Sequence, residues 1–420
     1  MKSDPAPPPM QTAYGCRFCG EPLRQTFVDL GLSPLCETYI SLSQLAEPES
    51  FYPLHCFVCE RCFLVQLPEH VSAASIFEEY AYFSSYSDSW LAHAREYVES
   101  ISSRLGLGPR SLVLELASND GYLLQYFKAR GIPVLGIEPA RNVGQVAVGK
   151  GIPTIAAFFG RRLARELASG GQRADLLLGN NVLAHVPDLN DFVAGMKLLL
   201  QPQGVITMEF PHLIRLVEEN QFDTIYHEHF SYLSFTTTER IFAVHGLVIF
   251  DVDELPTHGG SLRIYARHAE NELQPVLDNV ARLKEAEAQW GVGNLHAYQA
   301  FAEKVEATKR KILQFLIQAK ESGQSVAGYG APGKGNTLLN YCGIRTDLLP
   351  YTVDRSSYKQ GKFTPGTRIP IFPPERIRET RPDYLFILPW NLKEEIIAQN
   401  SFIRQWGGQF VVPIPELEIC

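Results

Sequence analysis

No stretch of this 420-residue sequence is apolar for long enough to span a bilayer. The N-terminal segment Met1–Met10 is proline-rich and has no apolar core, so we do not expect a secretory signal. The sequence also has no block rich in lysine or arginine, and its net charge is −8. These absences argue against nucleic acid or an anionic membrane as a partner, and a cytoplasmic location is the expectation.

The composition predicts an ordinary soluble globular protein. Hydrophobic residues make up 45% of the chain and charged residues 20%. A chain of this length predicts two or three domains with sizeable cores. Eight cysteines are present, and in a reducing compartment clustered cysteines bind metal more often than they form disulfides.

Two pairs of closely spaced cysteines predict a zinc site in the first module, residues 13–75, which follows a flexible tail at 1–12. Each CxxC turn offers two thiolates, and four thiolates close a tetrahedral Zn²⁺ site, so the metal would be structural. A further thiol, Cys56, lies in a strand-like run, and we do not include it. Ordinary buried thiols are the alternative. The predicted ligands are Cys16, Cys19, Cys59 and Cys62.

The second module, residues 76–268, alternates strand-like and helix-like segments, which predicts a parallel, doubly wound α/β sheet. A strand over 111–117 leads into a small-residue loop and a helix, and the next strand ends at Glu138. The loop contains neither GxGxxG nor a GKS/T phosphate motif. A ligand with a ribose but no pyrophosphate at this turn fits, and S-adenosylmethionine is such a ligand. A Rossmann-like domain with another ligand is the alternative.

A dense group of titratable and hydroxyl side chains follows the strand-like run 204–210. Such groups are costly in a core and common in a site, and loops between regular elements often carry catalytic residues. A polar surface loop with two chance histidines is the alternative. The group consists of Tyr226, His227, Glu228, His229 and Tyr232.

A helical bridge is predicted at residues 269–323. Helical periodicity indicates helices over 276–290 and 295–322, and the charged residues, Glu287 among them, suggest a solvated face.

The third module, residues 324–420, predicts a second, smaller Rossmann-like α/β domain. A strand enters a glycine-rich turn, and a helix is expected over 338–341. Backbone amides of the turn, a helix N-terminus and Lys334 would suit a diphosphate. A glycine turn without a ligand is the alternative.

Several long strings resemble the sugar C-methyltransferases of deoxysugar biosynthesis, which methylate C-3 of nucleotide-linked 4-keto-6-deoxyhexoses. The strings are ELASNDG from Glu115, DTIYHEHFSY from Asp223, HGGSLR from His258 and GYGAPGKGNT from Gly328. Together with the cysteine pairs they cover nearly the whole chain. The resemblance implies a zinc-bearing N-terminal domain, a central S-adenosylmethionine domain and a C-terminal Rossmann-like domain, with the substrate between them.

The resemblance also implies roles for individual residues. His229 would be the general base, with Tyr226 and Glu228 nearby, and Tyr226 or His185 would donate a hydrogen bond to the enolate. Glu138 would bind the ribose of the methyl donor, Phe158 and Phe159 would flank its adenine, and Asn180 and Asn181 would hold its aminocarboxylate. The remaining donor-site residues are Glu115, Ser118, Asn119, Asp120 and Gly121.

The nucleotide sugar, for which we expect thymidine diphosphate as the nucleotide, would meet residues from all three modules. Its diphosphate would face Lys334, and Arg263 could contribute. Oligomeric state is expected to be monomer or homodimer. The predicted substrate-binding residues are Tyr80, Tyr82, Ser84, His185, Arg263, Tyr329, Lys334 and Asn336.

Two competing hypotheses remain at this point. The first is an S-adenosylmethionine-dependent O- or N-methyltransferase acting on another small molecule. The second is a zinc-containing interaction protein with a non-catalytic methyltransferase domain, which the intact Glu115, Asp120, Glu138 and His229 argue against.

Overall fold

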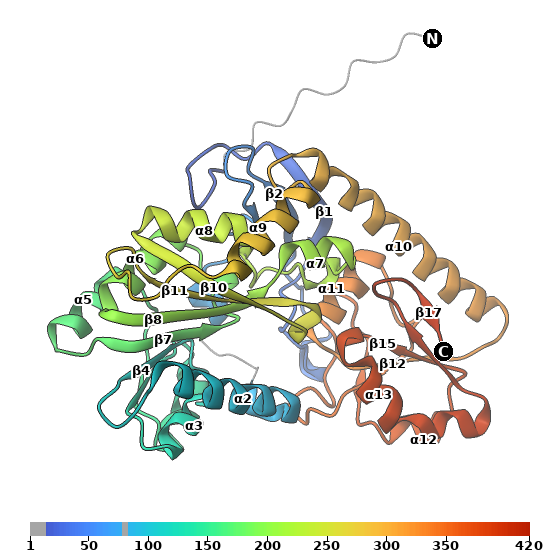
Figure 1. The fold of residues 1–420 in the computed structure, drawn as a ribbon. Helices are drawn as coiled ribbons and strands as arrows, with labels where there is room; N and C mark the ends of the chain where they lie inside the picture. The colour runs from blue at the N-terminus through green and yellow to red at the C-terminus, as the bar shows by residue number, and fades with distance from the viewer. Residues whose placement is uncertain (1–13, 78–82) are drawn as a thin grey trace, which may run out of the picture.

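The computed structural model describes residues 14–77 and 83–420, and three β-sheets organise this part of the chain (Figure 1). The predicted tail and the substrate candidates Tyr80 and Tyr82 lie outside the described residues. Within the described residues, no helix is both long and apolar enough to cross a membrane.

The N-terminal module is a four-stranded antiparallel sheet that includes a strand from the middle of the chain. Its order is β1 (Gln25–Ser33), β2 (Tyr52–Val58), β3 (Val65–Gln66) and β9 (Ser231–Tyr232). Strand β9 directly follows the titratable loop, and Val65 and Gln66 pair with Tyr232 and Ser231. The loop predicted to belong to the central domain is therefore anchored in the N-terminal sheet.

The four predicted zinc ligands come together at one end of this sheet. The sulfur atoms of Cys16, Cys19, Cys59 and Cys62 all lie within 4.8 Å of one another. Two tight turns make this approach, with positive φ at Gly20 (77°) and at Phe63 (62°). Four convergent thiols fit tetrahedral Zn²⁺ and leave no ligand position open, which is the chemistry of a structural site. Cys56 is buried in β2 and is not part of this group of four.

The central sheet confirms the predicted α/β architecture and adds an antiparallel edge. Strands β6, β5, β4, β7 and β8 run parallel; β11 pairs antiparallel with β8, and β10 pairs antiparallel with β11. Their bounds are β4 (Val113–Leu116), β5 (Val134–Ile137), β6 (Thr154–Ile155), β7 (Ala174–Asn180), β8 (Leu200–Pro211), β10 (Leu247–Leu255) and β11 (Ser261–His268).

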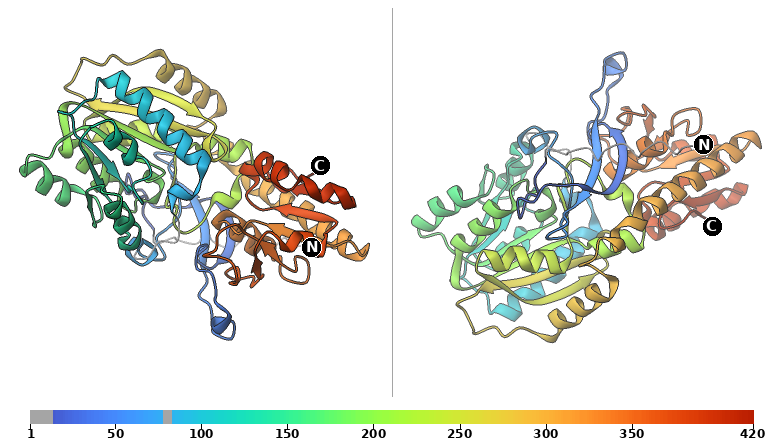
Figure 2. Two further views of the ribbon diagram at one scale, coloured as in Figure 1. Left: turned by 90° about the horizontal axis from the view of Figure 1, so that it is seen from below. Right: turned by 90° about the horizontal axis from the view of Figure 1, so that it is seen from above.

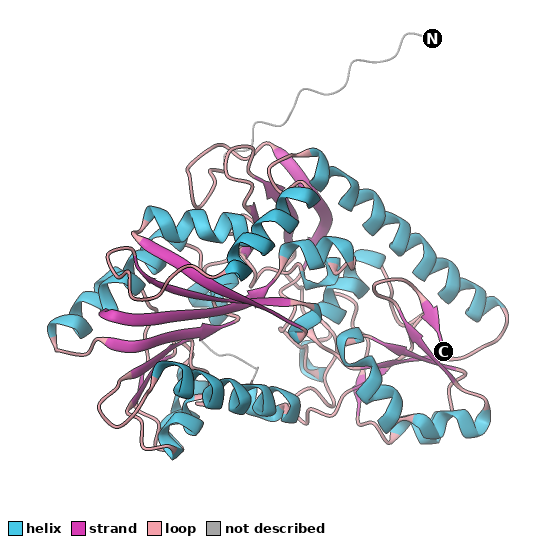
Figure 3. Ribbon diagram, viewed as in Figure 1, coloured by secondary structure: helices cyan, strands magenta, loops and turns pink. Residues whose placement is uncertain are grey.

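Helices cover both faces of this sheet (Figure 3). One apolar cluster packs α2 (Asp88–Leu105), α3 (Leu124–Ala129) and α4 (Arg141–Gly149) on one face. A second packs α5 (Arg161–Ser169), α6 (Leu189–Leu199), α8 (Phe235–Val244) and α9 (Asp278–Trp290) on the other. Shorter elements are α1 (Ala73–Phe77), α7 (Leu213–Glu218), and the 3₁₀ turns η1 (Leu42–Gln44), η2 (Ser84–Tyr86), η3 (Leu183–His185), η4 (Phe222–Thr224) and η5 (Thr257–Gly259).

The C-terminal module is a six-stranded sheet in the order β14, β13, β12, β15, β16, β17, parallel except for β17. The helix after the glycine-rich turn begins at Gly333, not near residue 338, so Lys334 lies in its first turn. The elements are β12 (Val326–Tyr329), α11 (Gly333–Cys342), β13 (Thr352–Val353), β14 (Ile371–Phe372), α12 (Arg376–Thr380), β15 (Tyr384–Ile387), η6 (Trp390–Leu392), α13 (Lys393–Gln399), η7 (Ser401–Trp406), β16 (Gln409–Val412) and β17 (Glu418–Ile419).

The long helix α10 (His296–Glu321) joins the N-terminal and C-terminal modules into one core (Figure 2). Phe301 of α10 stacks on Phe27 of β1 with ring centroids 4.7 Å apart. Further along the same helix, Phe315 packs edge-on against Tyr384 of β15. The predicted bridge is therefore a packed element whose apolar face buries against two modules at once.

Glu287 of α9 corrects the prediction of a solvated helical face. The residue is fully buried, and its carboxylate accepts hydrogen bonds from the backbone N–H groups of Phe235 and Thr236, both at 2.7 Å. It also pairs with Nε2 of His212 at 2.8 Å. The prediction was wrong for Glu287. The backbone N–H groups at the N-terminus of α8 need a hydrogen-bond acceptor there, and the charge pattern of α9 alone cannot show this.

We expect purified protein to contain about one zinc per chain by elemental analysis. Cys59→Ser should lose the metal and lower the melting temperature, whereas Cys56→Ser should keep it, because Cys56 is not part of the four-thiol group. A metal-free wild-type protein of full stability would contradict the zinc assignment.

Glu287→Ala should lower the free energy of unfolding by about 3 kcal/mol, because two backbone N–H groups and His212 would lose a buried acceptor. Denaturant unfolding measures this change. Glu285→Ala is the matched control, since Glu285 is exposed on the same helix, and its effect should stay within about 0.5 kcal/mol. Equal effects of the two substitutions would refute the capping role of Glu287.

Candidate active site

The loop after β4 is held in place by Glu138, which follows β5. The Glu138 carboxylate is buried and accepts hydrogen bonds from the backbone N–H groups of Asn119 (2.9 Å) and Ala140 (2.8 Å). The loop turns sharply, with positive φ at Ala117 (54°), Asn119 (48°) and Gly121 (75°). Backbone strain of this kind is common where a loop is shaped to receive a ligand.

Several buried polar atoms at the carboxyl ends of β4 and β7 have no hydrogen-bond partner among the described residues. Burying such groups costs free energy, so each needs a partner that a ligand could supply. Burial, with the neighbouring Glu138 and Asp120, raises the pKa of Glu115 well above its usual value. The atoms are both carboxylate oxygens of Glu115, Oγ of Ser118, Oδ1 of Asp120, Nδ2 of Asn180 and Oδ1 of Asn181.

This set of groups fits S-adenosylmethionine. Acidic and carbonyl oxygens suit a ligand with ribose hydroxyls, an ammonium group and a sulfonium, because each of these is a donor or a positive charge. The site also sits where α/β sheets bind ligands, beyond the carboxyl ends of the parallel strands. Phe158 is half exposed on the loop after β6 and is free to contact adenine, whereas Phe159 packs against Phe192.

The segment before α2 covers the donor loop. The backbone N–H of Ser84 donates to Oδ1 of Asn119 at 2.9 Å, and Lys150 pairs with Asp120 at 3.1 Å. Ser85 also donates to Asp120. Ser84, which was predicted to meet the sugar, contacts the donor loop through its backbone N–H, and its role at the sugar stays a prediction.

His229 has the geometry of a general base. Its Nδ1 lies 2.8 Å from the carbonyl oxygen of Thr224, which only accepts, so Nδ1 carries the proton and Nε2 is left with a lone pair. The ring lies 4.1 Å from that of Tyr226 and 4.6 Å from that of His185, between centroids. Burial, and next the neighbouring His185, lower the pKa of His229 well below its usual value, so the imidazole is neutral at neutral pH.

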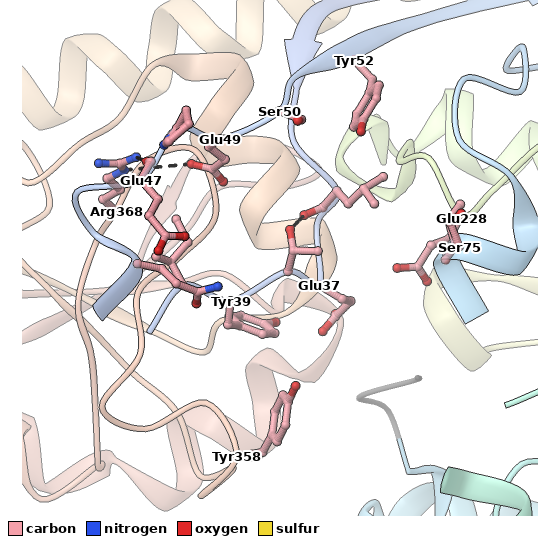
Figure 4. Close-up of a pocket in the computed structure, with 16 residues that line it drawn as sticks. Glu37, Tyr39, Glu47, Glu49, Ser50, Tyr52, Ser75, Glu228, Tyr358 and Arg368 are labelled. Carbon is pink, nitrogen blue, oxygen red and sulfur yellow. Dashed lines mark hydrogen bonds and ion pairs between the residues drawn. The ribbon is translucent and has the colours of Figure 1, made fainter. Parts of the chain in front are cut away.

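Glu228 faces a cavity of about 520 Å³ (Figure 4). Its Oε1 lies 3.7 Å from Sγ of Cys36. The Thr224 carbonyl orients His229, so this role does not fall to Glu228, which lines the cavity instead. All three modules contribute to the wall, which includes Glu37, Tyr39, Tyr52, Ser75, Glu228 and Tyr358.

The ammonium group of Lys334 lies near the loop that carries His229. Its Nζ donates to Oδ1 of Asn391 at 2.8 Å and lies 4.6 Å from the Trp390 ring centroid. Trp390 in turn donates to Oδ2 of the fully buried Asp223 at 2.8 Å. Burial raises the pKa of Asp223 to about 7, against the opposing effect of Lys334. Lys334 also contributes to the low pKa of His229, which places its charge near the base.

Three other predicted substrate residues have protein partners or lie elsewhere, although Oδ1 of Asn336 is buried without a hydrogen-bond partner among the described residues. Arg263 is buried, pairs with Glu209 and lies over the ring of Tyr97. Asn336 is buried and donates to the carbonyl oxygen of Cys36 at 2.6 Å. Tyr329 lines a separate cavity of about 600 Å³ within the C-terminal module, together with residues that include Arg355 and Arg378.

Sequence reasoning missed four residues of this region: Asp223, His258, Trp390 and Asn391. Asp223 and His258 lie inside the strings that carried the family resemblance, so their positions were visible although their roles were not. Trp390 and Asn391 had no local signal, because only the fold brings η6 against η4.

Three family models match consecutive parts of this chain. Family models match a zinc binding domain at residues 16–77, a methyltransferase domain at 90–252 and a C-methyltransferase C-terminal domain at 256–415. The chain is 37% identical over 403 residues to C-methyltransferase NovU of Streptomyces niveus, covering 96% of this chain and 95% of that protein.

More distant similarities cover only part of the chain. A ubiquinone biosynthesis O-methyltransferase of Bartonella tribocorum is 25% identical over 22% of this chain and 38% of its own length. The solved structure of PH0226 from Pyrococcus horikoshii OT3 is 15% identical, with a TM-score of 0.36, over 44% of this chain and 94% of that one.

The full-length match sets aside the hypothesis of a non-catalytic interaction protein. It also favours carbon over oxygen or nitrogen as the methylated atom, because the relative that spans the whole chain is named as a C-methyltransferase. The chain therefore belongs to the sugar C-methyltransferase family and is an S-adenosylmethionine-dependent C-methyltransferase.

Proposed function

We propose that the protein methylates C-3 of a nucleotide-linked 4-keto-6-deoxyhexose, with His229 as the general base. The observation that carries this proposal is the lone pair on Nε2 of His229, left free by the hydrogen bond from Nδ1 to the Thr224 carbonyl. A base is needed because the C–H bond at C-3, next to the ketone, is more acidic than an ordinary C–H bond but does not lose its proton to water at a useful rate. Thymidine diphosphate is the nucleotide we would test first.

In the first step, Nε2 of His229 takes the proton from C-3, and the electron pair of the C–H bond forms an enolate with its charge on the C-4 oxygen. The imidazolium that results keeps its Nδ1–H bond to Thr224, which orients the ring throughout. A low pKa keeps the base neutral before the reaction.

The enolate oxygen needs a hydrogen-bond donor. Tyr226 suits this role because burial raises its pKa well above the usual value, so the phenol keeps its proton. His185 is the other candidate, since burial lowers its pKa to about 4 and the ring is neutral, with a buried Nδ1 that has no partner among the described residues. Both lie beside His229.

S-adenosylmethionine supplies an electrophilic methyl group when bound. In the proposed arrangement, Glu115 and Asn181 hold the aminocarboxylate end, and Glu138 holds the ribose. Their positions at the carboxyl ends of β4, β5 and β7 would fix the direction in which the methyl group points. Positioning of the enolate carbon against this methyl group would contribute much of the rate.

The nucleotide sugar would occupy the cavity beside Glu228, with its diphosphate towards Lys334. The tyrosines at 39, 52 and 358 offer aromatic faces and hydroxyl groups to a base or a sugar. Carboxylates of Glu37 and Glu228 would accept hydrogen bonds from hydroxyl groups but would repel a phosphate. Arg368 also lines the cavity, but it pairs with Glu49 and donates to the carbonyl oxygens of Leu45 and Glu47. The cation of Lys334 is therefore the better partner for the diphosphate.

His229→Ala should lower the rate of C-3 proton exchange with solvent and the rate of methylation by at least about 100-fold each. Binding of S-adenosylhomocysteine should not change, because His229 is not among the groups proposed to hold the donor. Exchange is followed by NMR in deuterated water, and binding by calorimetry. His227→Gln is the control, since Nε2 of His227 lies against the Pro53 carbonyl at 3.2 Å. Full exchange in His229→Ala would refute the base.

Lys334→Met should raise the KM for the nucleotide sugar by about tenfold and shift the pH profile of kcat/KM. The neutral form of His229 is the active one, so activity falls as the pH drops through its pKa. Lys334 holds that pKa down, so removing its charge should move the acidic limb to higher pH. An unchanged KM would remove Lys334 from the diphosphate site, and an unmoved limb would separate its charge from His229.

A further inference from the structure

The turn before β11 has an unusual backbone conformation. His258 in η5 has a φ of 55°, and Gly259 and Gly260 follow with φ of 88° and 110°. A non-glycine residue in this region costs free energy, and such residues concentrate where a side chain must be aimed.

Partly buried contacts hold this turn. Oγ1 of Thr257 donates to Oε1 of Glu209 at 2.9 Å, and Nε2 of Gln221 donates to the carbonyl oxygen of Gly259 at 2.6 Å. The ring of Trp90 meets that of His258 edge-on, with centroids 5.0 Å apart.

Glu209 connects this turn to residues on neighbouring elements. Its side chain is fully buried, and it also accepts from His93 and Arg263. Although burial opposes ionisation, the bond from His93 and the charge of Arg263 lower the pKa of Glu209 to about 2, so it stays a carboxylate. Arg263, which the sequence placed at the diphosphate, is thus part of the support for this turn.

His258 in turn orients the side-chain amide of Asn181. Nδ2 of Asn181 donates to Nε2 of His258 at 2.9 Å. Since an amide nitrogen only donates, Nε2 must be unprotonated, and the low pKa of His258, about 4 because of burial, agrees with a neutral ring. The backbone N–H of Asn181 is also fixed, by the carbonyl oxygen of Glu209 at 2.7 Å.

The result is an acceptor with a defined direction. Oδ1 of Asn181 points away from His258, is buried, and has no hydrogen-bond partner in the described part of the chain. Without His258, the amide could rotate by half a turn and present its nitrogen instead. The orientation therefore decides whether Asn181 offers an acceptor or a donor to a ligand.

We infer that His258 is a positioning residue for the methyl donor, which fixes Asn181 so that its Oδ1 accepts a hydrogen bond from the ammonium group of S-adenosylmethionine. This inference rests on the proposed placement of Asn181 at the aminocarboxylate end. An acceptor in this position favours a ligand with an ammonium group. A flipped amide would instead point its own N–H groups at that ammonium group, and two donors repel each other.

Calorimetry with two ligands tests the inference. S-adenosylhomocysteine carries the ammonium group, and 5′-methylthioadenosine lacks the entire aminocarboxylate. His258→Gly removes the ring without strain at positive φ. It should weaken S-adenosylhomocysteine binding by about tenfold and leave 5′-methylthioadenosine binding within about twofold. His258→Gln should restore much of the affinity, because its side-chain oxygen can accept from Nδ2 of Asn181.

The matched variant is Asn181→Ala, which should show the same selective loss. The double variant should bind S-adenosylhomocysteine no more weakly than Asn181→Ala alone, because His258 acts only through Asn181. An equal loss for both ligands, or no loss, in His258→Gly would overturn the inference. Unchanged S-adenosylhomocysteine binding in Asn181→Ala would overturn the inference as well, and with it the placement of the aminocarboxylate. It would not affect the assignment of His229 as the base, which the proton-exchange assay tests separately.

Discussion

The pairing of β9 with β3 is the constraint on which the rest of the active site depends. It ties the end of the catalytic loop to the N-terminal sheet, while the start of the loop follows α7 from the central sheet. The loop is thus stretched between two modules. The Leu67 backbone N–H donates to the Phe230 carbonyl oxygen at 3.1 Å, immediately after His229. Any shift of the N-terminal sheet would therefore move His229.

The cysteine cluster reinforces this link without taking part in the chemistry. The side chain of Gln66, whose backbone pairs with Ser231, donates to Sγ of Cys16 at 3.1 Å. Oγ1 of Thr237, at the start of α8, donates to the carbonyl oxygen of Cys62 at 3.2 Å. A metal bound by the four thiols would stiffen β9 and the start of α8, which directly follow His229, and this gives a structural zinc a physical connection to the position of that residue.

Features carried by contiguous residues could be predicted from the sequence. The paired cysteines, the donor loop after β4 and the position of His229 each depend on residues close together in the chain. Contacts between distant segments could not be predicted. Burial of Glu287, the bond from Trp390 to Asp223, and the cavity wall shared by Glu37 and Glu228 exist only because segments far apart in the chain pack together. Arg263 shows the same limit, since its partner Glu209 lies on another strand.

The central claim is that this site makes a carbon–carbon bond next to a ketone. The most direct measurement is ¹³C NMR of the products formed when wild-type protein is given ¹³C-methyl S-adenosylmethionine and a panel of nucleotide-linked 4-keto-6-deoxyhexoses. We expect a labelled methyl group coupled to C-3 of at least one of these sugars. Label found on an oxygen or a nitrogen atom, or no transfer to any 4-keto sugar in the panel, would contradict it.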